Sequence, residues 1–421
     1  MSTVRTNNVQ VGQSLTATNN FTLYQPTVPD GTVRLGVGNT GATTLDAVTV
    51  NNAGNVSVPS LTVNSNNISS VNSLGFRNRI INGDFRINQR GVTSVAGGSE
   101  VYTLDRWIVA NYFLSGAVSV AQSSDAPAGF TNSLLVTNGT GEALAAGDFG
   151  SIRQKIEGFN VADLAWGTAS AVPITISFWV KSSVTGNYSV GLINNALNRA
   201  NRTVFTINAA NTWEQKTVQF SGDTTGTWVT NNGIGLYVDV VLVAGSNQHA
   251  AANTWTANAL EGVSGASANW VTSTNATFFI TGVQLEAGTV ASPFERRDYG
   301  RELAMCQRYF CKTMDQNTVP ANGLSGGANG YIYITPNATN AKVAATWKYP
   351  VTMRAIPTIT TFGYAGAASN TWRNIDNSNN GPTITAFNTG QEMVGLYGDG
   401  TVTAWAAGQG YVGAATASAE L

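Results

Sequence analysis

The chemistry available to this sequence begins with its titratable groups, which are few. Its 421 residues include 23 Asp and Glu, 22 Lys and Arg, and one histidine. A serine-hydrolase triad would have to use His249, but the surrounding stretch AGSNQHAAANTW is a small-residue loop without the GxSxG pattern that presents a nucleophile. We therefore interpret His249 as an exposed loop residue.

Glycoside cleavage needs two carboxylates roughly 5–10 Å apart across a groove. Candidates lie in or between the expected strands: Asp105, Glu142, Asp148, Asp239 and Glu261. Nothing in their spacing selects a pair. We therefore expect no enzyme activity.

Glycan binding without cleavage needs aromatic faces for sugar rings and amides for hydroxyl groups. The chain has ten Trp and thirteen Tyr. Trp107, Trp213 and Trp347 lie in strand patterns, and we expect them in the core. The better contact candidates lie in polar loops and form two sets: Trp228, Trp255 and Trp270, and then Tyr364, Trp372 and Arg373.

The cysteines and the charge balance exclude several classes. Cys306 and Cys311 are five residues apart in an expected helix, where they would point away from each other, so we expect free thiols in a reducing compartment. With His249 distant and no CxxC, we predict no metal site of that type and no cofactor. A net charge of −1 without a Lys/Arg run disfavours nucleic acid, and no long apolar window predicts membrane insertion.

The elements that must position these residues are predicted to be strands. Charged residues make up only 11% of the chain and Gly is abundant at 45, which favours short strands with tight turns and an all-β fold. In residues 1–75, singly spaced Val, Leu and Ile alternate with polar residues. This pattern predicts a β stem that needs oligomerisation to bury its surface, and a disordered linker is the alternative.

The remaining chain divides into three segments. Residues 76–297 carry strand patterns with turns every 10–15 residues, which predicts a jelly-roll β-sandwich. In ITISFWV, the alternation places Ile174, Ile176, Phe178 and Val180 in the core and Trp179 on the opposite face. Residues 298–314 predict a connector helix, and residues 315–421 predict a C-terminal β domain that forms a distal tip.

Several short sequence segments, which occur in a fixed order, resemble those of a known protein family. NRIINGDF (78–85), YTLDRW (102–107) and FFITGVQLEAG (278–288) are followed directly by FERRDYGRELAMCQRYF, and YPVTMRAIPTIT (349–360) comes later. This set resembles bacteriophage tail fibres with a carbohydrate-binding-module-like jelly roll. The resemblance implies that the first phrase lies near the last strand of the sandwich.

We interpret the first of these segments, residues 78–85, as the structural start of the jelly-roll domain. Asn82-Gly83 can take a positive φ, Asp84 can accept backbone N–H bonds, and Phe85 would plug the end of the sandwich. The resemblance implies that Asp84 and Glu286 could hold a structural calcium ion. The alternative partner for Glu286 is an arginine, for which Arg79, Arg296 and Arg297 are the candidates.

The resemblance also implies a role. We expect an elongated homotrimeric tail fibre in the virion, docked to other tail or baseplate proteins through residues 1–75. Its sandwich domains would bind a host-surface glycan or lipopolysaccharide. Two alternatives remain open: a structural collar or connector without receptor contact, and a tailspike depolymerase, for which the chain shows no β-helix repeat.

Overall fold

The structure of the chain, a computed structural model, separates into two compact units, Met1–Arg77 and Asn78–Leu421. The residues it describes are 8–11, 21–26, 31–39, 42–51, 56–58, 61–63, 66–68, 77–113, 115–260, 262–265, 270–324, 331–339, 341–364, 370–400, 403 and 405–421. Strands dominate both units, so the all-β prediction is confirmed. Within these residues no helix combines the length and hydrophobicity that a membrane span requires.

The N-terminal unit is an antiparallel meander whose strands pair in chain order. The strands are β1 (Asn8–Val11), β2 (Phe21–Tyr24), β3 (Thr32–Asn39), β4 (Ala42–Asn51) and β5 (Val56–Ser57), followed by the hairpin β6 (Leu61–Val63) and β7 (Asn66–Ile68). Leu23 on β2 lies opposite Leu35 on β3, which lies opposite Val48 on β4. Apolar residues therefore line up across one face of the sheet.

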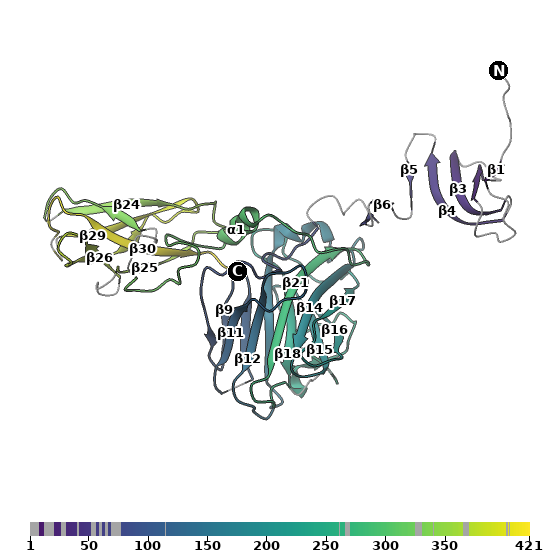
Figure 1. The fold of residues 1–421 in the computed structure, drawn as a ribbon, viewed down its shortest axis with the longest axis horizontal. Helices are drawn as coiled ribbons and strands as arrows, with labels where there is room; N and C mark the ends of the chain where they lie inside the picture. Colours follow the sequence, from purple (N-terminus) through teal and green to yellow (C-terminus); the bar gives the residue numbers. More distant parts are fainter. Residues whose placement is uncertain are drawn as a thin grey trace, which may run out of the picture. The chain divides into compact units, whose positions relative to one another are not determined.

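Two six-stranded antiparallel sheets form the jelly roll (Figure 1). The β13 sheet has the order β16 (Ala200–Ile207), β15 (Gly186–Ile193), β18 (Ile234–Ala244), β13 (Phe149–Glu157), β10 (Ile108–Tyr112) and β9 (Ser99–Tyr102). The β14 sheet has the order β17 (Glu214–Phe220), β14 (Ile174–Ser182), β21 (Thr277–Ala287), β12 (Ser133–Asn138), β11 (Val118–Ser123) and β8 (Ser94–Val95). The connections include three short 3₁₀ helices, Gly158–Asn160, Ala162–Leu164 and Ser246–Gln248, and the parallel pair β19 (His249–Ala250) and β20 (Gly262–Val263).

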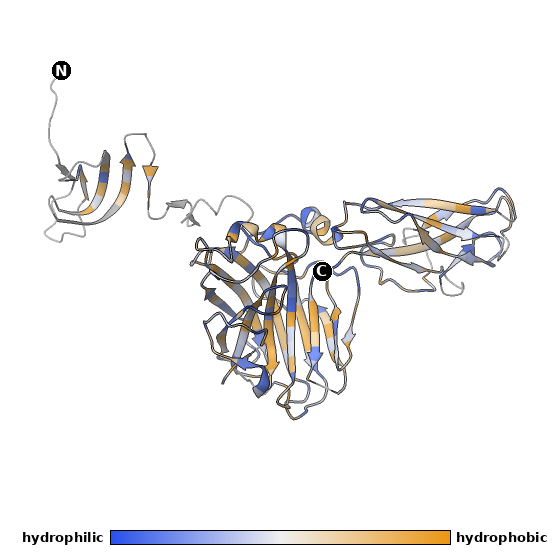
Figure 2. Cartoon of the chain, turned by 180° about the vertical axis from the view of Figure 1, so that it is seen from behind, coloured by the Kyte–Doolittle hydropathy of each residue, from blue (hydrophilic) through white to orange (hydrophobic). Residues whose placement is uncertain are grey.

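The core of the jelly roll lies between the inner faces of the two sheets, where hydrophobic residues recur along the strands (Figure 2). Strand β14 follows the predicted alternation: Ile174, Ile176, Phe178 and Val180 are fully buried. Trp179 is only partly buried on the other face. The prediction of a core position is wrong for Trp213, which is also partly exposed and donates its indole N–H to Asp125 at 3.0 Å.

The opening phrase lies beside β21, as the resemblance implies, with the Val283 N–H donating to the Gly83 carbonyl at 2.9 Å. The positive φ, 56°, belongs to Asn82 and not to Gly83. Gly83 is required for close approach instead, because a Cβ there would lie 2.2 Å from the Val283 carbonyl oxygen. Phe85 is fully buried against Trp107, with ring centroids 4.9 Å apart.

The connector helix is shorter than the sequence pattern predicts. Helix α1 (Tyr299–Gln307) is capped at its N-terminus by Asp298, whose side chain accepts the Arg301 N–H at 2.9 Å. Residues Phe310–Lys312 form strand β22 and pair with β30 (Tyr411–Ser418), so backbone pairing across the sheet replaces a further helical turn. Both cysteines are free thiols, as predicted, and both are buried.

The C-terminal β domain is built around β30. Its larger sheet has the order β22-β30-β26-β27, with β26 (Thr371–Asn374), β27 (Asn380–Thr383), and both β23 (Ile332–Ile334) and β25 (Thr358–Phe362) also paired to β30. The second sheet has the order β24 (Lys342–Lys348), β29 (Met393–Asp399) and β28 (Thr385–Phe387). Trp347, as predicted, is part of the core between them.

Candidate functional site

Two of the predicted contact residues are core residues. Trp270 and Trp372 are both fully buried, so the prediction that their rings stack on a surface glycan is wrong. Trp270 packs edge-on against Phe113 in the jelly roll, with ring centroids 5.9 Å apart. Trp372 packs near Trp405 in the C-terminal domain. Polar neighbours in sequence could not reveal this burial, because the rings that pack on the two tryptophans, Phe113 and Trp405, come from other parts of the chain.

The structure brings two other candidates together with a tryptophan that the sequence did not single out. Trp228 and Trp255 pack edge-to-face on Trp166 and on each other, with centroids 4.7–5.5 Å apart. Their indole N–H groups donate to the carbonyls of Thr225 and Ser221, which ties the loops to the sandwich. Both rings remain partly exposed, so their role in glycan contact stays a prediction.

The second predicted set, Tyr364, Trp372 and Arg373, does not form one cluster. Arg373 follows the buried Trp372 along β26, so the two side chains face opposite sides of the sheet. Tyr364 lies edge-on to Tyr331, with ring centroids 4.8 Å apart. Tyr364 and Arg373 are partly exposed and stay predictions as separate contact residues.

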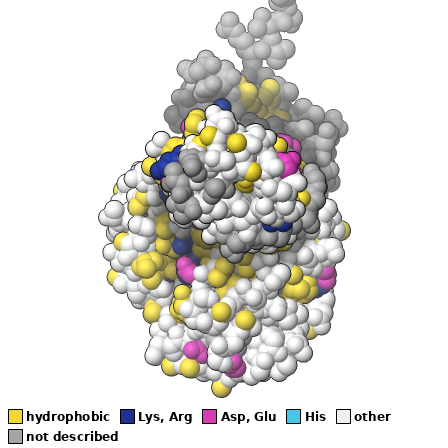
Figure 3. All heavy atoms as spheres, turned by 90° about the vertical axis from the view of Figure 1, so that its left-hand side faces the viewer, with side chains coloured by type: hydrophobic (Ala, Val, Ile, Leu, Met, Phe, Trp, Pro, Cys, Tyr) yellow, Lys and Arg dark blue, Asp and Glu magenta, His cyan; other side chains and the backbone are white. Residues whose placement is uncertain are grey.

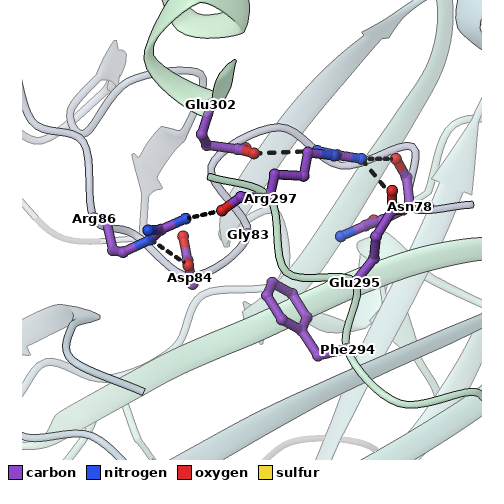
Figure 4. A pocket seen from close by; sticks show the side chains of 8 residues that line it. All are labelled: Asn78, Gly83, Asp84, Arg86, Phe294, Glu295, Arg297 and Glu302. Atoms are coloured by element: carbon purple, nitrogen blue, oxygen red, sulfur yellow. Dashed lines mark hydrogen bonds and ion pairs between the residues drawn. The ribbon is translucent and has the colours of Figure 1, made fainter. Parts of the chain in front are cut away.

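The two residues proposed for calcium take protein partners instead. Asp84 forms an ion pair with Arg86 at 2.5 Å, beside a space that admits no water molecule (Figure 4). Glu286 accepts hydrogen bonds from Gln284 and from the N–H and hydroxyl of Ser292, so the predicted arginine partner is wrong. In the part of the chain that the structure describes, no three His, Cys, Asp or Glu side chains gather in a way that could hold a metal ion.

The arginines named as partners for Glu286 are used elsewhere. Arg79 pairs with Asp163 at 2.6 Å, and Arg296 lies 4.7 Å from the Phe130 ring centroid. Arg297 reaches Glu302, as Figure 4 shows.

Four of the five candidate catalytic carboxylates lie in the described part of the chain, and each has protein partners of its own. Asp105 and Asp239 are fully buried, and burial raises the pKa of both. Glu142 accepts hydrogen bonds from the N–H and hydroxyl of Ser115, which lower its pKa. Asp148 accepts the Ala145 N–H as a turn residue.

Two further residues were named in the catalytic search. Glu261 lies outside the described residues. The His249 ring lies 2.9 Å from the Ala244 carbonyl oxygen. His249 begins strand β19 and is only partly exposed, so the interpretation of an exposed loop histidine is wrong.

The face of the β13 sheet that points away from the core carries a group of charged and aromatic side chains. The strand register places one row across all six strands: Tyr102, Ile108, Arg153, Asp239, Gly191 and Arg202. The positions flanking this row on β13 and β18, such as Ile152 and Val240, belong to the core, so the row faces outward. We call this surface the outer face.

Arg153 organises the charges at the centre of the outer face. Its guanidinium pairs with Asp239 and reaches Glu100 at 3.2 Å, and the Lys155 ammonium lies 3.6 Å from the same Glu100 carboxylate. Burial raises the pKa of Asp239, and Arg153 opposes that rise. The network fixes Glu100 and Lys155 before any ligand arrives, because each side chain already has a charged partner.

Aromatic rings flank this charged centre on the outer face. Tyr112 and Phe149 are stacked, with ring centroids 4.7 Å apart and planes 26° from parallel, and both are partly exposed. On the other side of the charges, Lys155 lies 5.7 Å from the Tyr237 ring centroid and 5.9 Å from that of Tyr102. The arrangement provides flat apolar surfaces on both sides of paired hydrogen-bonding groups, which suits sugar rings and their hydroxyls.

Sequence reasoning missed these aromatic residues for a definite reason. It favoured rings in polar loops, whereas Tyr112, Phe149 and Tyr237 lie within strands or at their ends. One usable signal was present: on β13, Phe149, Ser151, Arg153 and Lys155 alternate with Gly150, Ile152, Gln154 and Ile156. Where aromatic, polar and basic residues alternate with mainly apolar residues along a strand, the polar side of the strand is a candidate binding surface.

Comparison with solved structures gives distant matches. No family model and no curated protein matches the sequence. The enzymatically active domain of tailspike protein 4 from bacteriophage CBA120 is 12% identical with a TM-score of 0.28, over 50% of this chain and 21% of that one. TmCBM61, solved with β-1,4-galactotriose, is 11% identical with a TM-score of 0.27, over 50% of this chain and 99% of that one. A CBM4 structure is 16% identical with a TM-score of 0.26, over 49% of this chain and 98% of that one.

Proposed function

We propose that the jelly roll binds a neutral glycan on its outer face. The observation that carries this proposal is the stacked and partly exposed pair Tyr112 and Phe149 beside the fixed polar groups Glu100 and Lys155. Rings held in place before binding lose little conformational freedom when a sugar stacks on them. The same holds for Glu100 and Lys155, because ion pairs already orient them.

A neutral ligand fits the charge of this surface better than an ionic one. The cations of the outer face already pair with Glu100 and Asp239, so an anionic sugar would have to compete with these carboxylates. The wider surface visible in Figure 3 carries few charged side chains. The charges next to the aromatic rings are therefore already balanced, which favours an uncharged ligand.

Binding without cleavage is part of the proposal. A glycosidase needs two carboxylates that both reach the scissile bond. On the outer face Glu100 is exposed, but Asp239 is fully buried beneath Arg153. The geometry of the described residues supports holding a glycan and offers no acid and nucleophile pair at this place.

We propose further that the chain is a homotrimeric bacteriophage tail fibre that attaches the virion to a host-surface glycan. Support for assembly comes from the N-terminal meander, whose apolar face leaves Phe21 43%, Leu23 46%, Val33 47% and Val56 64% exposed. A sheet with such a face gains stability by packing it against other chains. The trimeric number and the docking of residues 1–75 on other tail proteins rest on the resemblance of the sequence phrases.

Glycan arrays and calorimetry with the full chain test the binding proposal. We expect Tyr112→Ala and Phe149→Ala each to weaken glycan binding about tenfold, the effect of losing one stacking surface. Phe159→Ala is the matched control, because Phe159 is 61% exposed and belongs to a 3₁₀ helix outside the outer face. Equal affinity for all four proteins would overturn the outer face as the site, and no binding to any host glycan would favour a structural role.

A further inference from the structure

The jelly roll and the C-terminal β domain line an open groove of about 430 Å³, a volume within the range of small-molecule sites. Its jelly-roll wall includes Arg90, Glu100 and Tyr102, and its C-terminal wall includes Phe310, Thr360 and Phe362. Figure 3 shows hydrophobic side chains with charged groups beside them where the jelly-roll surface passes beneath the C-terminal domain. The groove thus combines aromatic, hydroxyl and charged groups from both domains.

The floor of the groove is held rigidly. The Arg90 guanidinium lies 3.9 Å from the Phe310 ring centroid and 5.2 Å from the Tyr102 ring centroid, and it pairs with Glu420 at 2.6 Å. The Tyr102 hydroxyl donates to the Leu421 carbonyl at 2.8 Å. Because the Arg90 guanidinium stacks on aromatic rings and pairs with Glu420, it stays in place without a ligand. The floor of the groove therefore presents flat surfaces and no unpaired charge.

The two walls are fastened to each other beside the groove. Glu420 also pairs with the buried Arg106, and the Arg354 side chain donates to the Asn232 carbonyl of the jelly roll at 2.7 Å. Deeper in the junction, the buried Glu157 accepts hydrogen bonds from Arg308 at 2.7 Å and from the Tyr309 hydroxyl at 2.7 Å. Removing one member of such a buried network is costly, so the groove keeps its width.

The C-terminal wall offers a hydroxyl and an aromatic ring on one strand. Thr358, Thr360 and Phe362 alternate with Ile359 and Thr361 along β25, so Thr360 and Phe362 share a face. Thr360 is exposed and Phe362 is partly exposed. An aromatic face next to a hydroxyl group reproduces, on a second domain, the chemistry of the outer face.

The groove continues the outer face. Glu100 and Tyr102 on edge strand β9 line the groove and also belong to the outer face, where Tyr102 lies in the row of Arg153. A chain of sugars stacked across β13 and β10 would therefore reach β9 and enter the groove.

We propose that the groove is an end subsite for the same neutral glycan, in which the C-terminal domain binds the last one or two sugar units. The inference rests on the proposed function of the outer face. The C-terminal domain would then take part in glycan recognition. The ring of Phe362 and the hydroxyl of Thr360 would contact sugar units that extend beyond the jelly roll. The charges present are already paired, so the subsite selects uncharged sugar units.

The test uses the dependence of affinity on ligand length. The probes are neutral cello-, xylo- and galacto-oligosaccharides of about two to about six units, titrated into the full chain by calorimetry. Phe362→Ala is expected to weaken binding of the longest bound oligosaccharide about tenfold and to leave the shortest bound one unchanged. Tyr112→Ala is expected to weaken binding at every length.

A second variant and a control keep the test decisive. Thr360 is exposed, so we expect Thr360→Trp to retain the fold. The Trp side chain would fill the groove, so longer oligosaccharides should no longer bind more tightly than shorter ones. Phe387→Ala removes a 37% exposed ring from β28, away from the groove lining, and is expected to bind like the unmodified chain.

The outcomes separate the two proposals. If Tyr112→Ala weakens binding while Phe362→Ala and Thr360→Trp match the unmodified chain at every length, the end subsite is wrong and the outer face stands. If no oligosaccharide in the panel and no host glycan binds, both proposals fall.

Discussion

In strand β14 the apolar side chains meet the β13 sheet and are fully buried, whereas in the N-terminal meander Phe21 and Leu23 stay 43% and 46% exposed. Both regions alternate apolar and polar residues along antiparallel strands. The difference is the presence of a second sheet in the same unit. Alternation alone therefore creates an apolar face, and the partner that covers this face decides whether a chain folds alone or with copies of itself.

The largest expected effect tests the closed core. Trp107→Ala removes a fully buried side chain and is expected to lower the free energy of unfolding by about 3–5 kcal/mol. Trp213→Ala is the matched change on the outside of the sandwich, where the ring is partly exposed, and is expected to cost much less. Urea unfolding followed by circular dichroism measures both, and equal losses would contradict the placement of the core.

The open face of the meander gives the next prediction. Leu23→Asp places a charge among exposed apolar residues and is expected to reduce the assembly of the full chain, because burying the carboxylate between copies costs several kcal/mol. Light scattering should report a fall in mass toward the single chain, while unfolding of the jelly roll remains unchanged. A single-chain mass for the unmodified protein would contradict the assembly proposal.

A third prediction concerns the closed end of the sandwich. Gly83→Ala is expected to destabilise the chain by about 1–3 kcal/mol, because its Cβ would meet the Val283 carbonyl oxygen at 2.2 Å. Gly139→Ala adds the same atom where no other atom lies within 4 Å, so thermal unfolding should hardly change. If Gly83→Ala leaves the stability of the chain unchanged, then residues 78–85 do not need their close contact with β21.

The smallest effect arises at the junction of jelly roll and C-terminal domain. Burial lowers the pKa of Lys312 to about 8, although Asp105 and Asp315 oppose this, and its ammonium donates to three carbonyls that include Gln89 and Thr318. The unfolded lysine keeps its proton to about pH 10.4. Between about pH 8 and about pH 10.4 the unfolded chain binds more protons than the folded chain. The free energy of unfolding should therefore rise with pH by on the order of 1 kcal/mol per pH unit.

Lys312→Met supplies the comparison for that measurement. Tyr and Cys groups titrate in the same range, but they are common to both proteins and cancel in the difference. The unfolding free energy of the unmodified chain minus that of Lys312→Met should therefore rise from about pH 8 to about pH 10. A flat difference would show that Lys312 is not held as a buried amine.

Part of the candidate site could be predicted from the residue types. Scarce charges, one histidine and abundant aromatic residues favoured binding over catalysis. The individual positions could not be predicted, because Trp270 and Trp372 lie in polar sequence yet are fully buried, while Tyr112 and Phe149 lie in strand patterns yet stay partly exposed. Exposure depends on which loop or sheet covers a ring, and this is a long-range property.

The sequence by itself determined the strands and the inward alternation of β14, because these follow from local spacing and residue chemistry. Only the tertiary structure decided that Arg153, Glu100 and Asp239 share one surface and that β22 replaces the end of the predicted helix. Such contacts join residues far apart in the chain. They exist because strand register and the burial of whole sheets, rather than local preference, set which side chains meet.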